Sequence, residues 1–171
     1  MSAAENNGSP EQNLEVLRRV IEEGFNRGNY AALDPLFAAS YQEHQFGLKT
    51  TLEGFKEDLR SLRAGFPDLH LTIEDSIVDA DRVWIRMTAR GTHRGLFLGP
   101  PTGKPIVITV MDVCRFERGK IVEHWGVPDR FALLAQLGLL PQPRGEQSPA
   151  GAGEVASRAD RRRGRAAAGN R

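Results

Sequence analysis

Several features that mark common protein classes are scarce or missing in this sequence. Cys114 is the one cysteine, which excludes a disulfide within the chain and a zinc site built from cysteines. No apolar run reaches the roughly 18 residues of a membrane span, and the polar first ten residues lack the apolar stretch of a secretory signal. No two histidines stand at metal-ligand spacing, so a built-in metal is not expected. We therefore expect a cytoplasmic protein that makes no contact with membranes.

Charge is balanced over the whole chain but unevenly distributed along it. The totals are 23 basic and 22 acidic residues. Residues 142–171 hold seven Arg against three acidic residues, which leaves 16 basic and 19 acidic residues, a net charge of −3, in residues 1–141. A mildly acidic body argues against nucleic-acid binding through the folded domain. The composition predicts a flexible N-terminus over 1–10, one folded domain over 11–141 and a disordered tail over 142–171, which has few large apolar side chains.

Capping signals and helical spacing predict helices in the first third of the chain and at residue 130. Ser9–Gln12 combines an N-cap serine, a proline at the first helical position and a glutamine at the third, and Gly28 ends this helix. A short helical segment is expected in "NYAALDPLFAA". Thr50–Glu53 predicts a capping box at the start of another helix. A last short helix is expected in "RFALLAQLG".

From Leu69 onward, apolar and polar residues alternate as in half-buried strands. The stretch "IVITVMDVCRF" is apolar on both faces, which places it centrally in a sheet or at a subunit contact. Trp84, Arg86 and Arg90 share one face of their strand, expected to be the convex surface or a dimer contact. Helices followed by a strand meander indicate an α+β fold, in which N-terminal helices close the concave side of a curved, cone-shaped antiparallel sheet and leave a cavity.

Asp112 is the most informative single residue. It lies mid-strand on the same face as Ile108, Val110 and Cys114. A carboxylate there is costly unless it is paired, hydrogen-bonded or protonated. Acid–base groups with a raised pKa are often placed in this way, although a structural ion pair with an arginine or a helix end explains the position equally well.

The stretch "IVEHWGVPDR" supplies two further candidates. Asp129 directly precedes a helical pattern, so we expect an N-cap, and a helix start at the mouth of a cavity also presents its carboxylate to a ligand. His124 titrates near neutral pH and can shuttle protons, or it lies at the surface. Alternation puts His124 and Trp125 on opposite faces, so only one of them lines the cavity unless the chain bends.

Other motifs are weaker. His44 lies beside Glu43 after the second helical segment, in a stretch compatible with a short strand that enters the cavity, and site membership and loop packing are equally plausible for it. His93 is flanked by glycines in a long hairpin, where exposure is expected. The stretch "GPPTGK" lacks the first glycine and the Ser or Thr of a phosphate-binding loop. No Gly-X-Ser-X-Gly elbow is present, so a serine hydrolase is not indicated.

Taken in order, three stretches resemble a known family: "EEGFNRGNYAALDPLFAASYQEH", the segment from Gly54 to Lys104, and "MDVCRFERGKIVEHWGVPDRFALLAQLG". They are similar to the SnoaL-like polyketide cyclases of the nuclear transport factor 2-like superfamily, over about residues 12–140. The resemblance implies a cone-shaped α+β barrel, a homodimer or a dimer of dimers, and no cofactor. It implies that Asp129 is the general acid/base of an intramolecular aldol ring closure, and that Asp112 and His44 match recurrent family positions.

The leading hypothesis is therefore a cofactor-free ester cyclase or isomerase acting on a hydrophobic, polyketide-like carbonyl substrate. The candidate acid–base residues are Asp129, Asp112, His44 and His124. The side chains expected to contact the substrate are Trp125, Phe55, Met87 and Phe116. Two alternatives stay open: a non-catalytic small-molecule binder or dimerisation module, and an epoxide hydrolase. The last needs an arginine beside two carboxylates, and the arginines are expected to face outward.

Overall fold

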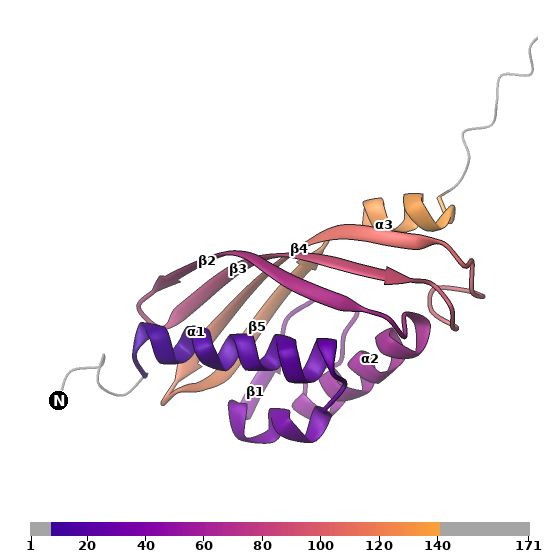
Figure 1. Ribbon diagram of the computed structural model, residues 1–171. Coiled ribbons are helices and arrows are strands. Elements are labelled where there is room, and N and C mark those ends of the chain that lie inside the picture. Colours follow the sequence, from indigo (N-terminus) through magenta and orange to yellow (C-terminus); the bar gives the residue numbers. More distant parts are fainter. Residues whose placement is uncertain (1–7, 141–171) are drawn as a thin grey trace, which may run out of the picture. The chain divides into compact units, whose positions relative to one another are not determined.

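A computed structural model of the chain describes residues 8–140, in which helices and one strand precede a run of four strands and a last short helix (Figure 1). The elements in chain order are α1 (Pro10–Arg19), the π-helix η2 (Val20–Asn26), the 3₁₀ helix η3 (Tyr30–Leu36), β1 (Phe37–Glu43), α2 (Leu52–Gly65), β2 (His70–Asp79), β3 (Arg82–Thr92), β4 (Pro105–Glu117), β5 (Lys120–Pro128) and α3 (Arg130–Leu137). The tail expected over 142–171, and most of the N-terminus expected over 1–10, lie outside the described residues.

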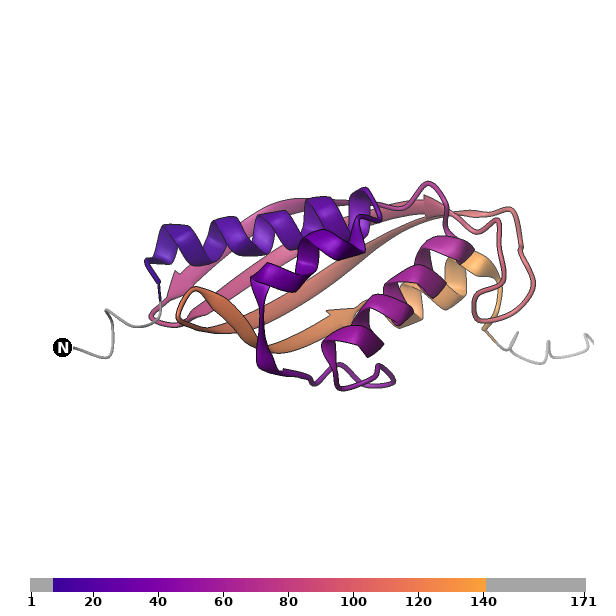
Figure 2. The same cartoon turned by 90° about the horizontal axis from the view of Figure 1, so that it is seen from below.

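The five strands form one sheet in the order β1-β5-β4-β3-β2. Neighbouring strands are antiparallel except β1, which pairs in parallel with β5. The predicted α+β class is confirmed, and β4 is the central strand. The sheet differs from the expectation in two respects, since it is not wholly antiparallel and it is not closed into a barrel. Helices α1, η2 and α2 cover one face of it (Figure 2).

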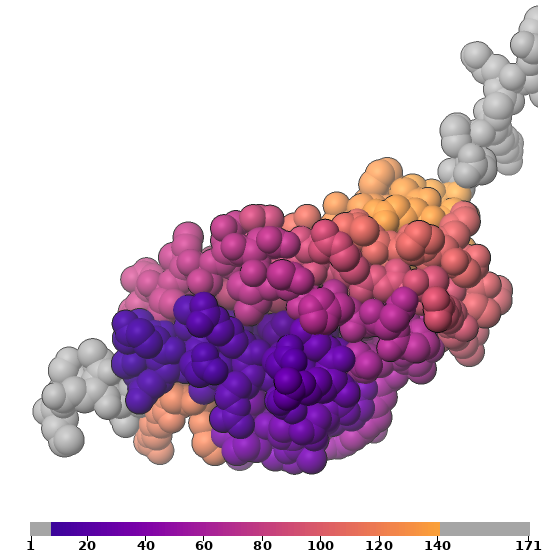
Figure 3. Space-filling model, in the orientation of Figure 1, coloured from indigo at the N-terminus to yellow at the C-terminus, as the bar shows by residue number. Residues whose placement is uncertain are grey.

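The period-two pattern of β4 explains which face they cover. Ile106, Ile108, Cys114 and Phe116 are buried, whereas Val107 and its odd-numbered neighbours turn to the opposite side. Leu17 of α1 and Ile21 of η2 pack against this inner face. Each fully buried side chain of this kind contributes about 1.5–3 kcal/mol of transfer free energy. The sheet and helices therefore share one apolar core. In Figure 3 the indigo and purple atoms of the N-terminal helices cover the near side of the molecule.

Helix α1 begins at the residue that the capping signals predict. Ser9 accepts a hydrogen bond from the Gln12 backbone N–H at 3.2 Å, and the Gln12 side chain accepts one from the Ser9 N–H at 2.9 Å. This capping box satisfies two donors that the first helical turn leaves free. The helix continues as η2 and stops before Gly28, whose φ of +70° suits a residue without a Cβ.

Two local predictions were wrong. The segment 37–39, expected to be helical, begins strand β1 instead, because it gains a partner in β5, with Phe37 opposite Ile121. The N-cap of α2 is Thr51 rather than Thr50: the Thr51 hydroxyl accepts from the Gly54 N–H at 3.2 Å. The Thr50 carbonyl accepts instead from the Glu43 N–H at 3.0 Å, which joins this turn to β1.

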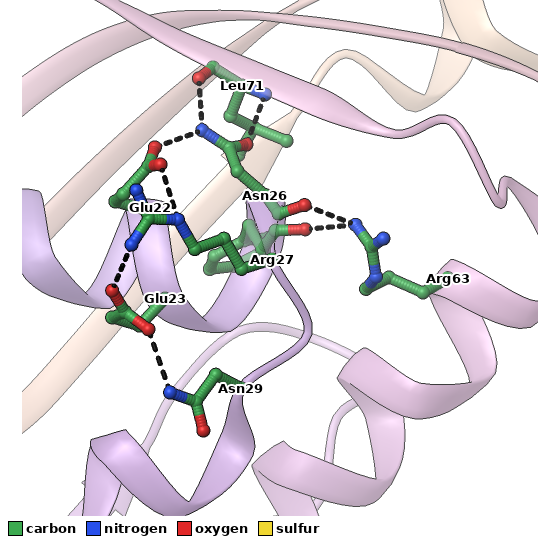
Figure 4. Close-up of polar contacts among 8 residues, drawn as sticks. Glu22, Glu23, Asn26, Arg27, Asn29, Arg63 and Leu71 are labelled. Atoms are coloured by element: carbon green, nitrogen blue, oxygen red, sulfur yellow. Dashed lines mark hydrogen bonds and ion pairs between the residues drawn. The ribbon is translucent and has the colours of Figure 1, made fainter.

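The end of η2 is tied to the edge strand β2 by one side chain (Figure 4). The Asn26 amide donates to the Leu71 carbonyl at 3.1 Å and accepts from the Leu71 N–H at 2.8 Å, so it imitates a neighbouring strand. Arg63 of α2 donates to the carbonyls of Phe25 and Asn26 at 2.5 and 3.0 Å. These bonds fix three elements at one corner of the sheet and orient Phe25 toward the interior.

At the same end of the strands, β4 extends beyond its pairing with β5, which reaches Val110. Helix α3 packs beside this unpaired part of the strand. The Gln136 side chain accepts from the Val107 N–H at 2.7 Å and donates to the Val107 carbonyl at 2.9 Å. An edge that would be open to another chain is thereby closed by the helix.

Replacing Asn26 with alanine should lower the free energy of unfolding by about 1–3 kcal/mol, because the Leu71 backbone groups lose their partner in a half-buried position. Urea unfolding followed by circular dichroism measures the change. Asn29→Ala is the matched control: its amide makes an exposed bond to Glu23, and its loss should cost no more than about 0.5 kcal/mol. Equal losses in the two variants would contradict the role given to Asn26.

Candidate active site

A cavity of about 400 Å³ lies between the inner face of the sheet and the helices. Its size falls within the range of about 300–1,000 Å³ that is usual for small-molecule sites. Most of its wall is apolar, and includes Phe25, Phe55, Leu59, Leu71, Ala89, Ile108 and Val110. The polar side chains that line it come from Gln45, Asp58, Ser61, Asp112, His124 and Arg130. Such a wall suits a hydrophobic ligand that carries a few oxygen atoms.

The deepest polar group is a histidine held between two carboxylates. His124 Nδ1 lies 2.8 Å from Glu43 Oε2, and His124 Nε2 lies 3.3 Å from Asp112 Oδ2. All three residues are buried, with 3% exposure for Glu43, 4% for Asp112 and 6% for His124. A doubly protonated imidazole ring satisfies both contacts by donating one N–H to each acid.

Three neighbouring strands bring this cluster together. In the register of the sheet, His124 of β5 faces Glu43 of β1 on one side and Cys114 of β4 on the other, two positions from Asp112. Tyr41 donates its hydroxyl to Glu43 Oε2 at 2.6 Å. The Gln45 backbone N–H donates to Glu43 Oε1 at 2.8 Å. Both oxygens of Glu43 are therefore satisfied, whereas Asp112 and His124 reach the cavity wall.

Burial and charge oppose each other at His124. Burial lowers its pKa, but the charge of Asp112, the hydrogen bonds to Asp112 and Glu43, and the charge of Glu43 together raise the pKa to about 10 from 6.5. For Glu43, burial raises the pKa, and the bonds from His124, Tyr41 and Gln45 outweigh it, so the pKa is lowered below its ordinary value. His124 is thus an imidazolium at neutral pH and Glu43 a carboxylate. The cluster thus presents a positively charged ring and the Asp112 side chain to the cavity.

The structure brings Asp112 and His124 together, but it places the other two candidate acid–base residues elsewhere. Asp129 is exposed and caps α3, where its Oδ1 accepts from the Ala132 N–H at 2.8 Å. The expected cap is confirmed, yet Asp129 is not among the residues that line the cavity. His44 lies on the outer side, stacked on Trp125 with ring centroids 4.6 Å apart, and 3.3 Å from Glu123.

The four side chains expected to contact substrate are also divided. Phe55 lines the cavity. Met87 and Phe116 point inward but are fully buried in the core and do not line it. Trp125 lies outside with His44, which resolves the alternative posed by strand alternation: His124 is the inward residue of the pair.

Glu43 was not recognised as a site residue, although it completes the cluster. Its segment was expected to follow a helix, so no face could be assigned to it. The signal was present in the alternation of Phe37, Tyr41 and Glu43, all buried along β1. A buried acid two residues after a buried tyrosine would have suggested a polar network on an inner face.

The long hairpin loop between β3 and β4 forms part of the wall through Phe97 and Leu98. His93, expected to be exposed, is fully buried and stacks on Phe66 with centroids 5.1 Å apart. The loop can approach α2 because two glycines allow it: a Cβ on Gly95 would lie 1.9 Å from the Ala64 carbonyl oxygen, and one on Gly65 would lie 2.4 Å from Phe97 Cβ. At Gly65 and Gly95, glycine therefore marks close packing rather than exposure.

Two negative findings apply to the described residues. Within residues 8–140 no group of three or more His, Cys, Asp or Glu side chains is arranged to hold a metal ion. In the same part of the chain no helix combines the length and the apolar character that crossing a membrane would require.

The fold and the cavity define a small α+β protein of the nuclear transport factor 2-like type, with an acid–base pair on an apolar wall. The model of the SnoaL-like polyketide cyclase family matches residues 15–137, and the chain belongs to this family. A search of curated proteins found no match.

The chain is also similar in fold to several solved structures. TsrD from Streptomyces laurentii is 26% identical with a TM-score of 0.72, covering 78% of this chain and 99% of its own. AclR from Streptomyces galilaeus, a candidate hydroxylase, is 27% identical with a TM-score of 0.70, covering 78% and 100%. IdmH from Streptomyces antibioticus, a candidate polyketide cyclase, is 34% identical with a TM-score of 0.68, covering 74% and 99%.

The charged state of His124 should be visible in the pH dependence of stability. Its folded pKa of about 10 lies above the ordinary 6.5, so its contribution is complete below pH 6.5 and disappears as the pH rises toward 10. The free energy of unfolding of the wild type, measured by urea titration between these values, should fall relative to His124→Gln, with a limiting slope of about 1.4 kcal/mol per pH unit.

The same substitution at the other histidine of this region, His44→Gln, provides the control, because His44 lies outside the buried cluster. That variant should keep the wild-type pH dependence. A constant difference between the wild type and His124→Gln over the whole interval would contradict a charged His124.

Proposed function

We propose that this protein catalyses an aldol-type ring closure, or a related isomerisation, of a hydrophobic, polyketide-like carbonyl compound with its own acid–base side chains and no cofactor. One observation carries the proposal: the pairing of buried Asp112 with the His124 imidazolium on the wall of an apolar cavity. Membership of the SnoaL-like polyketide cyclase family supports the substrate class.

In the proposed reaction the Asp112 carboxylate removes a proton from the carbon beside a carbonyl group. The electron pair of the broken C–H bond moves into the enolate, whose oxygen gains negative charge. The enolate carbon then attacks a second carbonyl of the same molecule and forms the new C–C bond, and the resulting alkoxide takes the proton back from Asp112. The product is an isomer of the substrate, so the reaction consumes no co-reactant.

The imidazolium of His124 has two roles in this scheme. It orients the Asp112 carboxylate through the 3.3 Å contact, and its positive charge stabilises negative charge that develops nearby in an apolar-walled cavity. Glu43 keeps the ring charged, and Tyr41 and the Gln45 backbone keep Glu43 in place. Asp112 is therefore the proposed catalytic base, and Glu43 is a positioning residue.

Epoxide hydrolysis fits the site less well. It needs a water held by two carboxylates with an arginine beside them, whereas Asp112 and Glu43 both engage His124. Arg86 and Arg90 face outward as expected. Arg130 departs from that expectation and lines the mouth of the cavity, where it donates to the Phe46 carbonyl at 2.8 Å.

The direct test is exchange of carbon-bound hydrogen. An anthraquinone that carries a β-keto methyl ester side chain is incubated with the protein in D₂O, and mass spectrometry follows deuterium uptake at the activated carbon and ring closure. Asp112→Asn should lower the exchange rate by about 10²–10⁴-fold, the usual contribution of a general base.

Asp129→Asn is the matched control, because asparagine preserves the N-cap of α3 and should preserve the rate. Loss of exchange in Asp129→Asn with retention in Asp112→Asn would transfer the role to Asp129. A wild type that binds the compound but exchanges no faster than buffer would indicate a binding module instead of an enzyme.

We also propose that a second copy of the chain covers the outer face of the sheet, as the family resemblance implies. Ile77, Trp84, Val113 and Trp125 are aligned across four strands by the pairing register. Met111 and Val127 pair in the next row, with 45% and 66% exposure. A continuous apolar band of this kind is typical of protein–protein contacts.

Met111→Glu should therefore shift the protein to single chains in size-exclusion chromatography with light scattering, because it buries an unpaired charge at the centre of the band. Leu96→Glu makes a similar change at an exposed leucine of the β3–β4 loop and should leave the assembly intact. A monomeric wild type at micromolar concentration would contradict the proposed dimer.

A further inference from the structure

One polar side chain in the cavity has no role in the cluster described above. Gln45 lies two residues after the end of β1, and its backbone is held in place: its N–H donates to Glu43, and its carbonyl accepts from the Leu48 N–H at 3.2 Å. Its side chain lines the cavity. Among residues 8–140 the Gln45 amide has no hydrogen-bond partner, although both oxygens of Glu43 and both ring nitrogens of His124 are engaged.

The position of this amide depends on a glycine in β5. A Cβ added to Gly126 would lie 2.1 Å from Gln45 Oε1 and 3.0 Å from His124 Cε1. The amide therefore occupies the space that a side chain at residue 126 would fill, beside the edge of the His124 ring. Gly126 is also the residue that pairs with Asp112 across the two strands. Because Gly126 has no side chain, the Gln45 amide can lie next to the Asp112–His124 pair.

The chemistry of the neighbouring groups suggests what this amide binds. A carboxylate that removes a proton beside a carbonyl works best when a hydrogen-bond donor meets the carbonyl oxygen as it becomes charged. Both N–H groups of His124 are directed to Glu43 and Asp112, so the ring donates no further hydrogen bond. A primary amide supplies two donors without adding charge to a cluster that already holds two carboxylates and one imidazolium.

We infer that Gln45 is a substrate-contacting residue whose amide hydrogen-bonds a carbonyl or enolate oxygen of the ligand beside Asp112, in a space kept open by Gly126. This inference rests on the proposed proton-transfer function for its catalytic meaning. It also gives the site a binding preference: planar apolar compounds that carry a carbonyl oxygen should bind more tightly than hydrocarbons of the same shape.

The test uses two soluble probes that differ in carbonyl oxygens, anthraquinone-2-sulfonate and anthracene-2-sulfonate, with affinities measured by fluorescence titration. Gln45→Met keeps the length of the side chain and removes its hydrogen bonds. It should weaken anthraquinone-2-sulfonate binding by about 3–10-fold, the equivalent of one hydrogen bond, and leave anthracene-2-sulfonate unchanged. Gly126→Ala, which displaces the amide, should have the same selective effect.

Gln42→Met is the control, an identical substitution at an exposed glutamine of β1. It should change neither affinity. In the deuterium-exchange assay Gln45→Met should lower the rate by about 10²-fold, as removal of one oxyanion donor does. If the wild type exchanges no hydrogen yet the carbonyl-selective loss of binding occurs, the proposed reaction fails and the Gln45 contact stands. Equal effects on both probes, no effect, or no binding by the wild type would overturn the inference.

Discussion

The charged contact of His124 with Asp112 and Glu43 is the constraint on which the site depends. Three ionisable groups are removed from water here, at a cost of several kcal/mol for each ion unless they pair with one another. The imidazolium offsets this cost by facing both acids at once, and Tyr41 and the Gln45 N–H complete the set of bonds. Removal of His124 would leave two carboxyl groups without a counter-charge in an apolar core.

The parallel pairing of β1 with β5 makes this contact possible. Glu43 can reach His124 because β1 runs parallel to β5 and places the two residues opposite each other in register. Asp112 arrives from the other side because β4 is the central strand and projects its even-numbered residues inward. A small change in register would move one acid to the outer face. The topology and the chemistry are therefore parts of one arrangement.

The cavity exists because the helices do not fill the space in front of these strands. The end of η2 is fixed to β2 through Asn26, and the β3–β4 loop is fixed to α2 through close contacts at Gly65 and Gly95. These attachments fix η2, α2 and the β3–β4 loop around the cavity. The Asp112–His124 pair faces this apolar-walled hollow.

Much of the architecture could be predicted from local patterns. Caps predicted the starts of α1 and α3, and alternation predicted both the strands and the inward face of Asp112, because these signals depend on neighbours in sequence. Glu43 was missed because a seven-residue strand that pairs with the far end of the chain carries little local signal. Trp125 was assigned to the cavity although alternation allowed only one of the two residues there. His93 was expected at the surface because glycine indicates either mobility or close packing, and sequence alone does not distinguish them.

The most direct test of this account is the protonation state of His124, observed by NMR in protein labelled with ¹⁵N at histidine. The account predicts that both ring nitrogens remain protonated at about pH 8 and titrate near 10, far above the ordinary 6.5. A ring that is already neutral at that pH, with a midpoint near 6.5, would show that the two acids do not hold a charge between them, and the proposed acid–base pair would lose its physical basis.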